Sequence, residues 1–567
     1  MARPNFATRN ILKLKFVRNF GNVNANNVWT RENIVISPFK EIQPPTLTVS
    51  DYIWQNLDKW GDKPAMVCGI TNRSYTFHEL HKYSRKFATK LRSKLDIREG
   101  DVTCVMMSNN PEYALVTLGS LEAGAAVTTI NPIYTAHEVQ RQLLLSNAKL
   151  LIGTPDTIGV LKEACKMAKI NLPIIAVTNP GESLPAGTMS FQEILDDNNE
   201  DFSILNSVKK NLDEIALLPY SSGTTGLPKG VELVHRTVVT NLAQQSGDGI
   251  RHCSYTTDSY QESLMAVLPF YHMYGLSLIM LHKLSIGGKI VTLPKFETKT
   301  FLNAIEEHKT SILHIVPPLA SFIACHPEAK KEYLSNIHTY VCGAAPLPKQ
   351  DIFRILEKSK PGVDFLQIYG LTEISPIATT VPPGSKKYAT VGLALPNTQL
   401  RVVDSEDRNL GPDAVGELLI KGPQIMKGYR NNPEATKAVI TDDGWFRSGD
   451  LASIDRDGVV TICDRIKELI KVKGYQVAPA ELESVLKEHP DILDAAVIGV
   501  PDPKMGEVPK AFVVVKDGRK KDSVDLKKFV EDRVAVYKRI SDVEFLGNLP
   551  RNPSGKILRK VLRESYA

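Results

Sequence analysis

The sequence has few cysteines, and their spacing excludes two common small-domain architectures. The seven cysteines among 567 residues are scattered, without a Cys-x-x-Cys pair or another zinc-like spacing. An odd, scattered set is typical of a reducing compartment, so neither a disulfide framework nor a zinc finger is predicted. The length and the 43% hydrophobic content instead predict several buried cores and more than one domain.

Acidic residues are missing from the N-terminus. Six basic residues precede the first acidic residue, Glu32, and the other charges balance at 63 against 63 once these six are subtracted from the 69 basic residues. The net charge of +6 is therefore local, and no nucleic-acid partner is expected. A secretory apolar core is also missing. The acid-free, arginine-containing composition predicts a mitochondrial transit peptide within a leader over residues 1–41, with an untargeted tail on a cytoplasmic protein as the alternative.

Long uncharged runs are rare, and the most conspicuous one does not predict a membrane span. Residues 264–281 carry no charge but include Pro269, Gly275 and Ser277, which fit a buried strand, a turn and a buried helix. The C-terminal residues Glu-Ser-Tyr-Ala also lack the Ser-Lys-Leu peroxisomal address, so that route is not expected. No transmembrane segment is predicted; peripheral membrane contact and the oligomeric state stay open.

A Walker A loop is absent, yet one loop is built for phosphates. Residues 221–231 read Ser-Ser-Gly-Thr-Thr-Gly-Leu-Pro-Lys-Gly-Val, and the lysine is followed by glycine rather than by serine or threonine. Glycines allow the backbone N–H groups to turn inward, while hydroxyls and one cation add further contacts. A flexible surface connection is the alternative. The candidate polyphosphate ligands are Ser221, Ser222, Gly223, Thr224, Thr225, Gly226 and Lys229.

The order of apolar runs predicts the fold class. Short runs such as Val102–Met107 and Leu150–Ile152 alternate with helical segments, which indicates βαβ units and a parallel sheet. Shorter strands bounded by turns, among them Gly416–Gly422, predict a β subdomain. We expect an α/β N-terminal domain over 42–463 and a small α+β C-terminal domain over 464–567.

A second motif, Tyr369-Gly-Leu-Thr-Glu373, follows an apolar run and is expected at a strand end, where α/β sheets bind ligands. Glu373 could hold a Mg²⁺ that bridges ATP phosphates, because magnesium takes a carboxylate together with substrate oxygens. Tyr369 could stack on adenine, and Thr372 could donate to the α-phosphate. A polar turn that starts a helix is the alternative.

Two further segments could complete a nucleotide site. Small residues at Gly343, Ala344 and Ala345 would let a flat base lie against the backbone, although a close-packed turn is the simpler explanation for them alone. Asp450 follows Arg-Ser-Gly and could accept two hydrogen bonds from ribose hydroxyls, although an isolated Asp in this position is more often a turn residue.

Together these strings resemble the signatures of the adenylate-forming superfamily, which includes acyl-CoA synthetases, 4-coumarate:CoA ligases and beetle luciferases. The resemblance runs from about Leu47 to Arg563, in family order. It implies that Lys556, in Pro-Ser-Gly-Lys, is the catalytic lysine and that Arg465 is a second ribose contact. It also implies a hinge at Asp464, about which a mobile C-terminal domain swings.

The resemblance assigns further roles residue by residue. Lys471, Gly474 and Gln476 would face the site in one domain orientation or the other, and His272 would gate or orient the acyl site rather than act as an essential base. The implied catalytic residues are Lys556, Thr372, Glu373 and His272, and the implied metal contacts are Glu373 and Thr224. The acyl pocket is expected around His272, Val316, Gly343 and Gln367.

The implied activity is that of a two-step ligase with Mg²⁺, ATP and coenzyme A. A carboxylate would attack ATP to give an acyl-adenylate and pyrophosphate, and the CoA thiol would then displace AMP. Within the superfamily the chain looks most like a fatty acyl-CoA synthetase for medium- to long-chain acids. An aryl-CoA ligase of the 4-coumarate or benzoate type is the runner-up, and a non-catalytic ATP- and acyl-binding protein is the alternative from another class.

Overall fold

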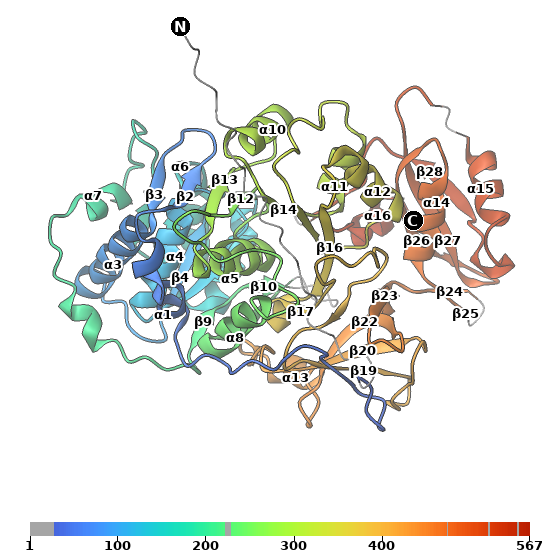
Figure 1. Cartoon of the computed structure of the whole chain (residues 1–567), viewed down its shortest axis with the longest axis horizontal. Coiled ribbons are helices and arrows are strands. Elements are labelled where there is room, and N and C mark those ends of the chain that lie inside the picture. Colours follow the sequence, from blue (N-terminus) through green and yellow to red (C-terminus); the bar gives the residue numbers. More distant parts are fainter. Residues whose placement is uncertain (1–27, 222–227, 473–474, 520–521, 553–554, 567) are drawn as a thin grey trace, which may run out of the picture.

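The computed structural model describes residues 28–221, 228–472, 475–519, 522–552 and 555–566. A large N-terminal body contains two sheets flanked by helices and a smaller β subdomain, and a compact unit follows at the C-terminus (Figure 1). This arrangement confirms the predicted α/β class with a large N-terminal and a small C-terminal domain. Of the predicted leader, residues 1–27 lie outside the described residues.

The first sheet has the strand order β10-β11-β9-β5-β4-β6-β7-β8, and β21 pairs with β11. The run from β9 through β5, β4, β6 and β7 to β8 is parallel, as the alternating apolar runs predict. Helices α5 and α6 cover one face through a cluster that includes Cys104, Leu151 and Leu161. The strands are β4 (Val102–Met106), β5 (Ala126–Thr129), β6 (Ala148–Gly153), β7 (Ile174–Ala176), β8 (Met189–Ser190), β9 (Ile215–Leu217), β10 (Tyr220–Ser221), β11 (Lys229–Val234) and β21 (Gly428–Tyr429).

The second sheet has the order β18-β17-β16-β15-β14-β12-β13-β2-β3 and is parallel from β2 to β16. Its strands are β2 (Pro64–Cys68), β3 (Ser74–Thr76), β12 (Ser263–Ala266), β13 (Lys289–Thr292), β14 (Ile312–Ile315), β15 (Thr339–Cys342), β16 (Asp364–Gly370), β17 (Ile377–Thr380) and β18 (Leu393–Ala394). The uncharged run 264–281 forms β12, a turn and the buried π-helix Tyr274–Leu281, as predicted. Within the described ranges no helix is long and apolar enough to cross a membrane.

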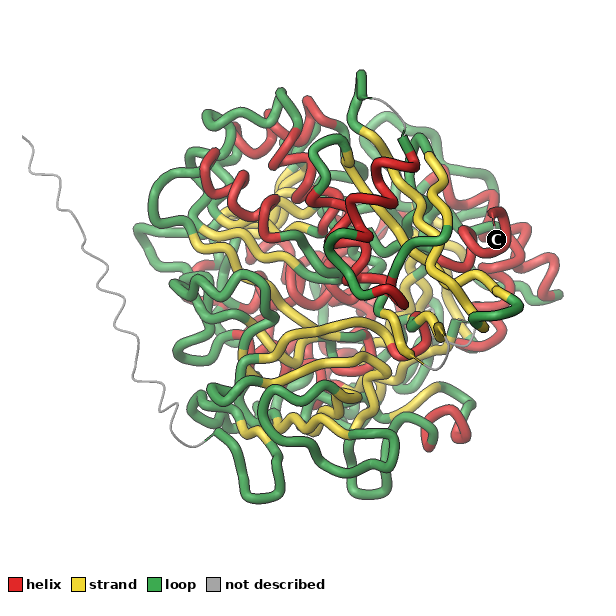
Figure 2. Tube along the Cα trace, turned by 90° about the vertical axis from the view of Figure 1, so that its right-hand side faces the viewer, coloured by secondary structure: helices red, strands yellow, loops and turns green. Residues whose placement is uncertain are grey.

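Helices pack between and around these sheets, so that one apolar core joins both of them. Figure 2 shows the helical segments in red around the yellow strands. The helices of the N-terminal body are α1 (Val49–Trp54), α2 (Leu57–Trp60), α3 (Phe77–Lys94), α4 (Glu112–Glu122), α5 (Ala136–Ser146), α6 (Pro155–Ala168), α7 (Phe191–Asp196), α8 (His235–Gln245), α9 (His282–Ser285), α10 (Thr298–Glu307), α11 (Pro317–Cys325), α12 (Lys349–Lys358) and α13 (Pro433–Lys437).

The β subdomain is an antiparallel sheet of order β1-β19-β20-β22-β23. Its strands are β1 (Val35–Ile36), β19 (Gln399–Val403), β20 (Gly416–Lys421), β22 (Phe446–Ile454) and β23 (Val460–Arg465). Strand β1 lies inside the leader predicted over 1–41, and Val28, Val35 and Phe39 are buried. The folded body therefore starts N-terminal of residue 42, because these apolar side chains complete the core of the sheet.

The C-terminal unit has its own sheet and its own core. The sheet order is β25-β24-β27-β26, with β28 beside β27, and a separate apolar cluster begins at Ile470. The predicted boundary between 463 and 464 falls two residues before the end of β23, so Asp464 and Arg465 still belong to the β subdomain. The elements are β24 (Ile470–Val472), β25 (Tyr475–Val477), β26 (Ile492–Asp502), β27 (Gly506–Val515), β28 (Asp542–Phe545), α14 (Pro479–Glu488), α15 (Ser523–Glu531) and α16 (Arg559–Tyr566).

Gly392 lies where the second sheet contacts the β subdomain, and substituting it tests how closely the two pack. Gly392 has φ +79°, and a Cβ there would lie far inside van der Waals contact with the Thr380 carbonyl. The Gly392 carbonyl also accepts a 2.8 Å hydrogen bond from the Val460 N–H. We expect Gly392→Ala to lower the free energy of unfolding by about 3 kcal/mol or more in denaturant titrations, through strain and clash together.

Gly362 is the matched control, because it has φ +81° but open space where a Cβ would lie. Gly362→Ala should cost only the backbone strain, about 1 kcal/mol. Equal losses in the two variants would contradict the close approach at Gly392.

Candidate active site

The site forms where parallel strands of the second sheet end together. Strands β14, β15 and β16 are neighbours and run parallel. Val316 follows β14, Gly343 follows β15, and Tyr369 lies near the end of β16, so all three are at one edge of the sheet. Ligands of α/β sheets bind at this carboxyl edge. The predicted position of the Tyr369–Glu373 motif at a strand end is therefore confirmed, and a 3-10 turn over Thr372–Ile374 follows it.

Glu373 is the buried carboxylate of this edge. The Ser221 hydroxyl lies 2.8 Å and the Tyr429 hydroxyl 3.0 Å from Glu373 Oε1, and both donate to it. Burial, and then the Glu373 charge, raise the pKa of Tyr429, so this phenol stays a donor. The donor set fits a Mg²⁺ ion that Glu373 would share with substrate oxygens, because magnesium prefers oxygen ligands and rarely needs an all-protein cage.

The two ends of the predicted phosphate loop form a β-hairpin. Ser221 on β10 pairs with Lys229 on β11, so the lysine starts a strand and not a helix, in contrast to a Walker A lysine. The Lys229 ammonium lies 4.8 Å from the ring centroid of Tyr429. The candidates Ser222, Gly223, Thr224, Thr225 and Gly226 lie outside the described residues, so their phosphate and metal roles remain predictions.

Asp450 connects three segments that are distant in sequence. The Tyr369 hydroxyl donates to its Oδ2 at 2.7 Å, and Arg465 Nε lies 3.3 Å from its Oδ1. Asp450 and Arg465 face each other across β22 and β23. Burial raises the pKa of Asp450, whereas Arg465, Tyr369 and Lys556 oppose this shift. A buried carboxylate with cationic neighbours suits the predicted ribose contact.

Lys556 reaches this group from the C-terminal unit. Burial, and then Arg465, lower the pKa of Lys556 to about 8, while Asp450 and Glu468 act in the opposite direction. The preceding Gly555 has φ +84°, and a Cβ there would lie 2.9 Å from Pro318 Cδ. The loop that carries Lys556 therefore packs on the start of α11, in the N-terminal body.

Lys471 lies elsewhere in this domain orientation. It is on the β24–β25 hairpin, paired with Gln476, and its side chain is exposed while its N–H donates to Glu507 at 2.7 Å. Gly474 lies outside the described residues, and the side chain of Gln476 is not described. Of these two lysines, only Lys556 has a charge that is found to act on Asp450.

The segment predicted to line the adenine site follows β15 directly. Ala344 has φ +73°, a left-handed conformation that is strained for a residue with a Cβ. A Cβ at Gly343 would lie 2.8 Å from Ile368 Cγ1, so this turn has no room for a larger residue than glycine. Ala345 completes the turn that leads toward α12.

His272 lies before the π-helix, and its Nδ1 accepts a 3.2 Å hydrogen bond from the Tyr274 N–H. Burial lowers the pKa of His272 to about 4, so the ring is neutral near pH 7. A neutral, oriented imidazole agrees with a positioning role. Gln367, from the same predicted pocket, is buried, and its amide donates to the Tyr388 carbonyl.

Tyr429 is the site residue that sequence reasoning missed. It contacts both Glu373 and Lys229 because β21 pairs with β11, a contact between residues about two hundred positions apart in the chain. No local motif marks it. Only the pairing of distant strands reveals its place.

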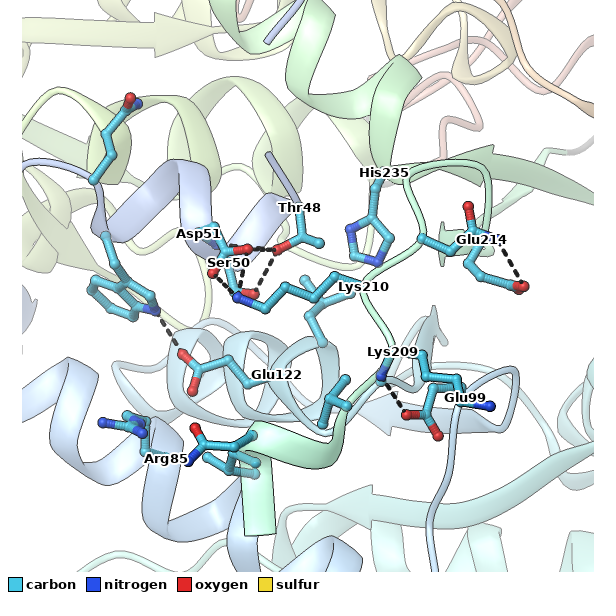
Figure 3. Close-up of a pocket in the computed structure, with 18 of the residues that line it drawn as sticks. Thr48, Ser50, Asp51, Arg85, Glu99, Glu122, Lys209, Lys210, Glu214 and His235 are labelled. Atoms are coloured by element: carbon cyan, nitrogen blue, oxygen red, sulfur yellow. Dashed lines mark hydrogen bonds and ion pairs between the residues drawn. The ribbon is translucent and has the colours of Figure 1, made fainter. Parts of the chain in front are cut away.

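A cavity of about 610 Å³ lies apart from these residues, beside α1, α3 and α4 (Figure 3). Its charged side chains largely satisfy one another: Lys210 lies 2.7 Å from Asp51 Oδ1, and the Trp54 indole donates to Glu122 at 2.6 Å. None of the predicted site residues lines it. The cavity therefore does not carry the predicted nucleotide chemistry.

Comparisons with known proteins agree with this geometry. The model of the AMP-binding enzyme family matches residues 53–430, and that of the AMP-binding enzyme C-terminal domain matches 481–556. The chain is 38% identical to 4-coumarate–CoA ligase 1 of Arabidopsis thaliana over 532 residues, covering 92% of this chain and 93% of the relative. It is 39% identical to 4-coumarate–CoA ligase 1 of Petroselinum crispum over 531 residues, covering 92% and 95%.

A solved structure shows the same architecture. ATP-bound MatB from Rhodopseudomonas palustris superposes with a TM-score of 0.81 at 27% identity, covering 92% of this chain and 99% of the other. The fold and the site thus define a nucleotide-binding enzyme with a separate C-terminal lysine-bearing unit. The chain belongs to the AMP-binding enzyme family.

Glu122, which lines the cavity in Figure 3, should make the stability of the fold depend on pH. Burial raises the pKa of Glu122 from 4.5 to about 7, although the Trp54 hydrogen bond opposes the shift. The folded state therefore holds this proton to higher pH than the unfolded state, and stability falls as pH rises from about 4.5 to about 7. Glu122→Gln should raise the free energy of unfolding by about 1 to 3 kcal/mol at pH 8 and hardly change it at pH 4.5.

Glu99, which lines the same cavity, should show the opposite effect on stability, because its pKa is lowered rather than raised. Although burial opposes the shift, a hydrogen bond from the Lys209 backbone N–H and the Arg92 charge hold the pKa of Glu99 below its ordinary value. Glu99→Gln should therefore lose stability at pH 8. Urea titrations at the two pH values measure both variants, and a Glu122→Gln gain that is the same at both would contradict the raised pKa.

Proposed function

We propose that this chain is an ATP-dependent acid–CoA ligase that works through an acyl-adenylate. One observation carries the proposal: the Lys556 loop of the C-terminal unit packs on Val316 and Pro318, and the Lys556 charge acts on Asp450, near the strand edge that also presents Glu373. This convergence makes a non-catalytic binding protein the poorer explanation, because simple nucleotide binding does not need a lysine delivered by a second domain.

The first half-reaction uses the domain orientation that brings Lys556 to Asp450. A carboxylate oxygen of the acid attacks the α-phosphorus of ATP, a new C–O–P linkage forms, and the bond to pyrophosphate breaks. Lys556 offsets the charge that develops between carboxylate and phosphate, Thr372 donates to the α-phosphate, and Lys229 holds the leaving pyrophosphate. Mg²⁺, held by Glu373 and ATP oxygens, would supply further charge neutralisation.

The second half-reaction requires no strong protein base. The CoA thiol attacks the acyl carbon of the mixed anhydride, a thioester forms, and AMP leaves with the electron pair of the broken C–O bond. A free thiol has a pKa of about 8.5, so enough thiolate exists near neutral pH. Lys471, Gly474 and Gln476 are proposed to face the site after the C-terminal unit turns about Asp464.

An aryl acid of the 4-coumarate class is the better supported substrate. The relatives at 38–39% identity over 92% of this chain are named 4-coumarate–CoA ligases. They favour the aryl alternative over the medium- to long-chain fatty acid that was the first expectation from the sequence. Import into mitochondria is proposed only from the N-terminal composition, with the cytoplasm as the alternative.

The proposed function is tested by measuring pyrophosphate release and thioester formation with Mg·ATP across aryl and fatty acids, with and without CoA. We expect acid-dependent pyrophosphate release, and thioester only when CoA is present, with aryl acids preferred. Fatty acids as the preferred substrates would overturn the aryl assignment, and no release with any acid would overturn the ligase.

Separate assays of the two half-reactions test the role of Lys556. Lys556→Ala should slow adenylation by about 100-fold or more, since it removes a transition-state charge partner. Thioester formation from supplied acyl-adenylate should survive. Lys471→Ala, the matched lysine removal, should spare ATP binding and adenylation but slow the thioester step. Equal loss of both half-reactions in Lys556→Ala would contradict the assignment.

The pH profile of adenylation tests the charge on Lys556. The ammonium is the active form and has a pKa of about 8, so the rate should fall roughly tenfold per pH unit above that value. Lys556→Arg should be slower near neutrality but flat up to high pH, because guanidinium keeps its proton. A wild-type-like alkaline decline in the arginine variant would show that another group titrates.

A further inference from the structure

A fully buried histidine, His314 on β14, takes no part in the two half-reactions. Its side chain is 0% exposed, and within the described ranges neither ring nitrogen has a hydrogen-bond partner. Buried polar groups are normally hydrogen-bonded, and an orphan in a well-packed core requires an explanation. A ligand that supplies the missing partner is one such explanation.

The surroundings of His314 are polar but otherwise satisfied. Lys283 is also 0% exposed, and its ammonium lies 3.0 Å from His252 Nε2, 3.0 Å from His282 Nδ1 and 3.2 Å from Cys253 Sγ. These three acceptors match the three N–H donors of a lysine. Lys283 therefore does not need His314, and His314 is left as the unsatisfied member of the cluster.

His314 is neutral and can both donate and accept. Burial, and then the Lys283 charge, lower the pKa of His314 well below its ordinary value. A neutral imidazole has one N–H and one lone pair available. Its ring meets His252 at 5.7 Å and Tyr274 at 5.8 Å between centroids, both edge-on, so it is held in place by aromatic contacts.

The face that carries His314 leads directly to the catalytic lysine. Side chains alternate along a strand, so His314 and Val316 share one face, and Val341, paired with His314, continues that face to Gly343. At the other end, a Cβ on Gly555 would lie 3.3 Å from Val316 Cγ2, and Lys556 follows Gly555. Two strand residues span about 6.6 Å, so His314 lies about one strand repeat further along this face than Val316.

We propose that His314 closes the far end of the acid pocket and selects acids with a hydroxyl group at the end opposite the carboxylate. The inference rests on the proposed function, because it places the acid carboxylate at Lys556. A hydroxyl can accept from the imidazole N–H or donate to the imidazole lone pair, whereas an alkyl end would leave both nitrogens without partners. A long fatty chain would also have to pass this polar ring.

The test compares matched acids that differ only at the far end. The probes are phenylpropenoate with its para-hydroxy derivative, and hexanoate with its terminal hydroxy and terminal carboxy derivatives. Acid-dependent pyrophosphate release gives kcat/KM for each. We expect the hydroxylated member of each pair to be preferred by at least about tenfold, because a site built to hydrogen-bond a hydroxyl rejects the analogue without it.

Variants of His314 assign this preference to the ring. His314→Leu should reduce the ratio to near one while kcat/KM for the plain acid stays the same or rises. His314→Gln keeps hydrogen-bonding capacity and should retain part of the preference, which covers the case in which the leucine variant does not fold. His308, a half-buried histidine whose Nε2 also has no described partner, is the matched control, and His308→Leu should leave the ratio unchanged.

The outcomes separate the two levels of the proposal. Pyrophosphate release with a preference for plain acids, or an unchanged ratio in His314→Leu, would overturn the role of His314 and leave the ligase intact; an ordered water would then be its partner. A preference for the terminal carboxy acid would also overturn it, since Lys283 would then act as a charge partner. Absence of release with every acid would overturn the proposed function itself.

Discussion

The buried carboxylate of Asp450 is the interaction on which the site depends. It lies on β22 of the β subdomain, accepts from Tyr369 at the end of β16, and pairs with Arg465 at the end of β23. Lys556 of the C-terminal unit adds a second cation to the same charge. One carboxylate therefore connects the second sheet to the β subdomain and attracts the charge of the C-terminal unit, because a buried charge must be compensated.

The balance of charge around Asp450 is compatible with the domain turn that we propose. The charges of Arg465 and Lys556 both act on this buried carboxylate, and the pKa of Lys556 falls to about 8 because burial and Arg465 disfavour its charge. In the proposed mechanism this lysine acts in one half-reaction and is withdrawn for the next.

Much of this arrangement could be predicted from local sequence, and the rest could not for a physical reason. The strand preceding Tyr369, the non-helical start at Lys229 and the α/β order follow from apolar periodicity and from glycine and proline positions. Tyr429 and His314 carry no local signal, because their roles arise from strand pairing and from burial. Charge composition alone assigns residues 28–41 to a leader. It carries no information about tertiary packing, and so it misses that Val28, Val35 and Phe39 complete a core.

The most direct test of the central claim is isotopic exchange of pyrophosphate into ATP in the absence of CoA. If the orientation in which the Lys556 charge acts on Asp450 is the one for adenylation, as we propose, the first half-reaction should run and reverse without the second substrate. We predict acid-dependent exchange that requires Mg²⁺ and is lost in Lys556→Ala. Exchange that occurs only when CoA is added, or that persists in Lys556→Ala, would contradict the account.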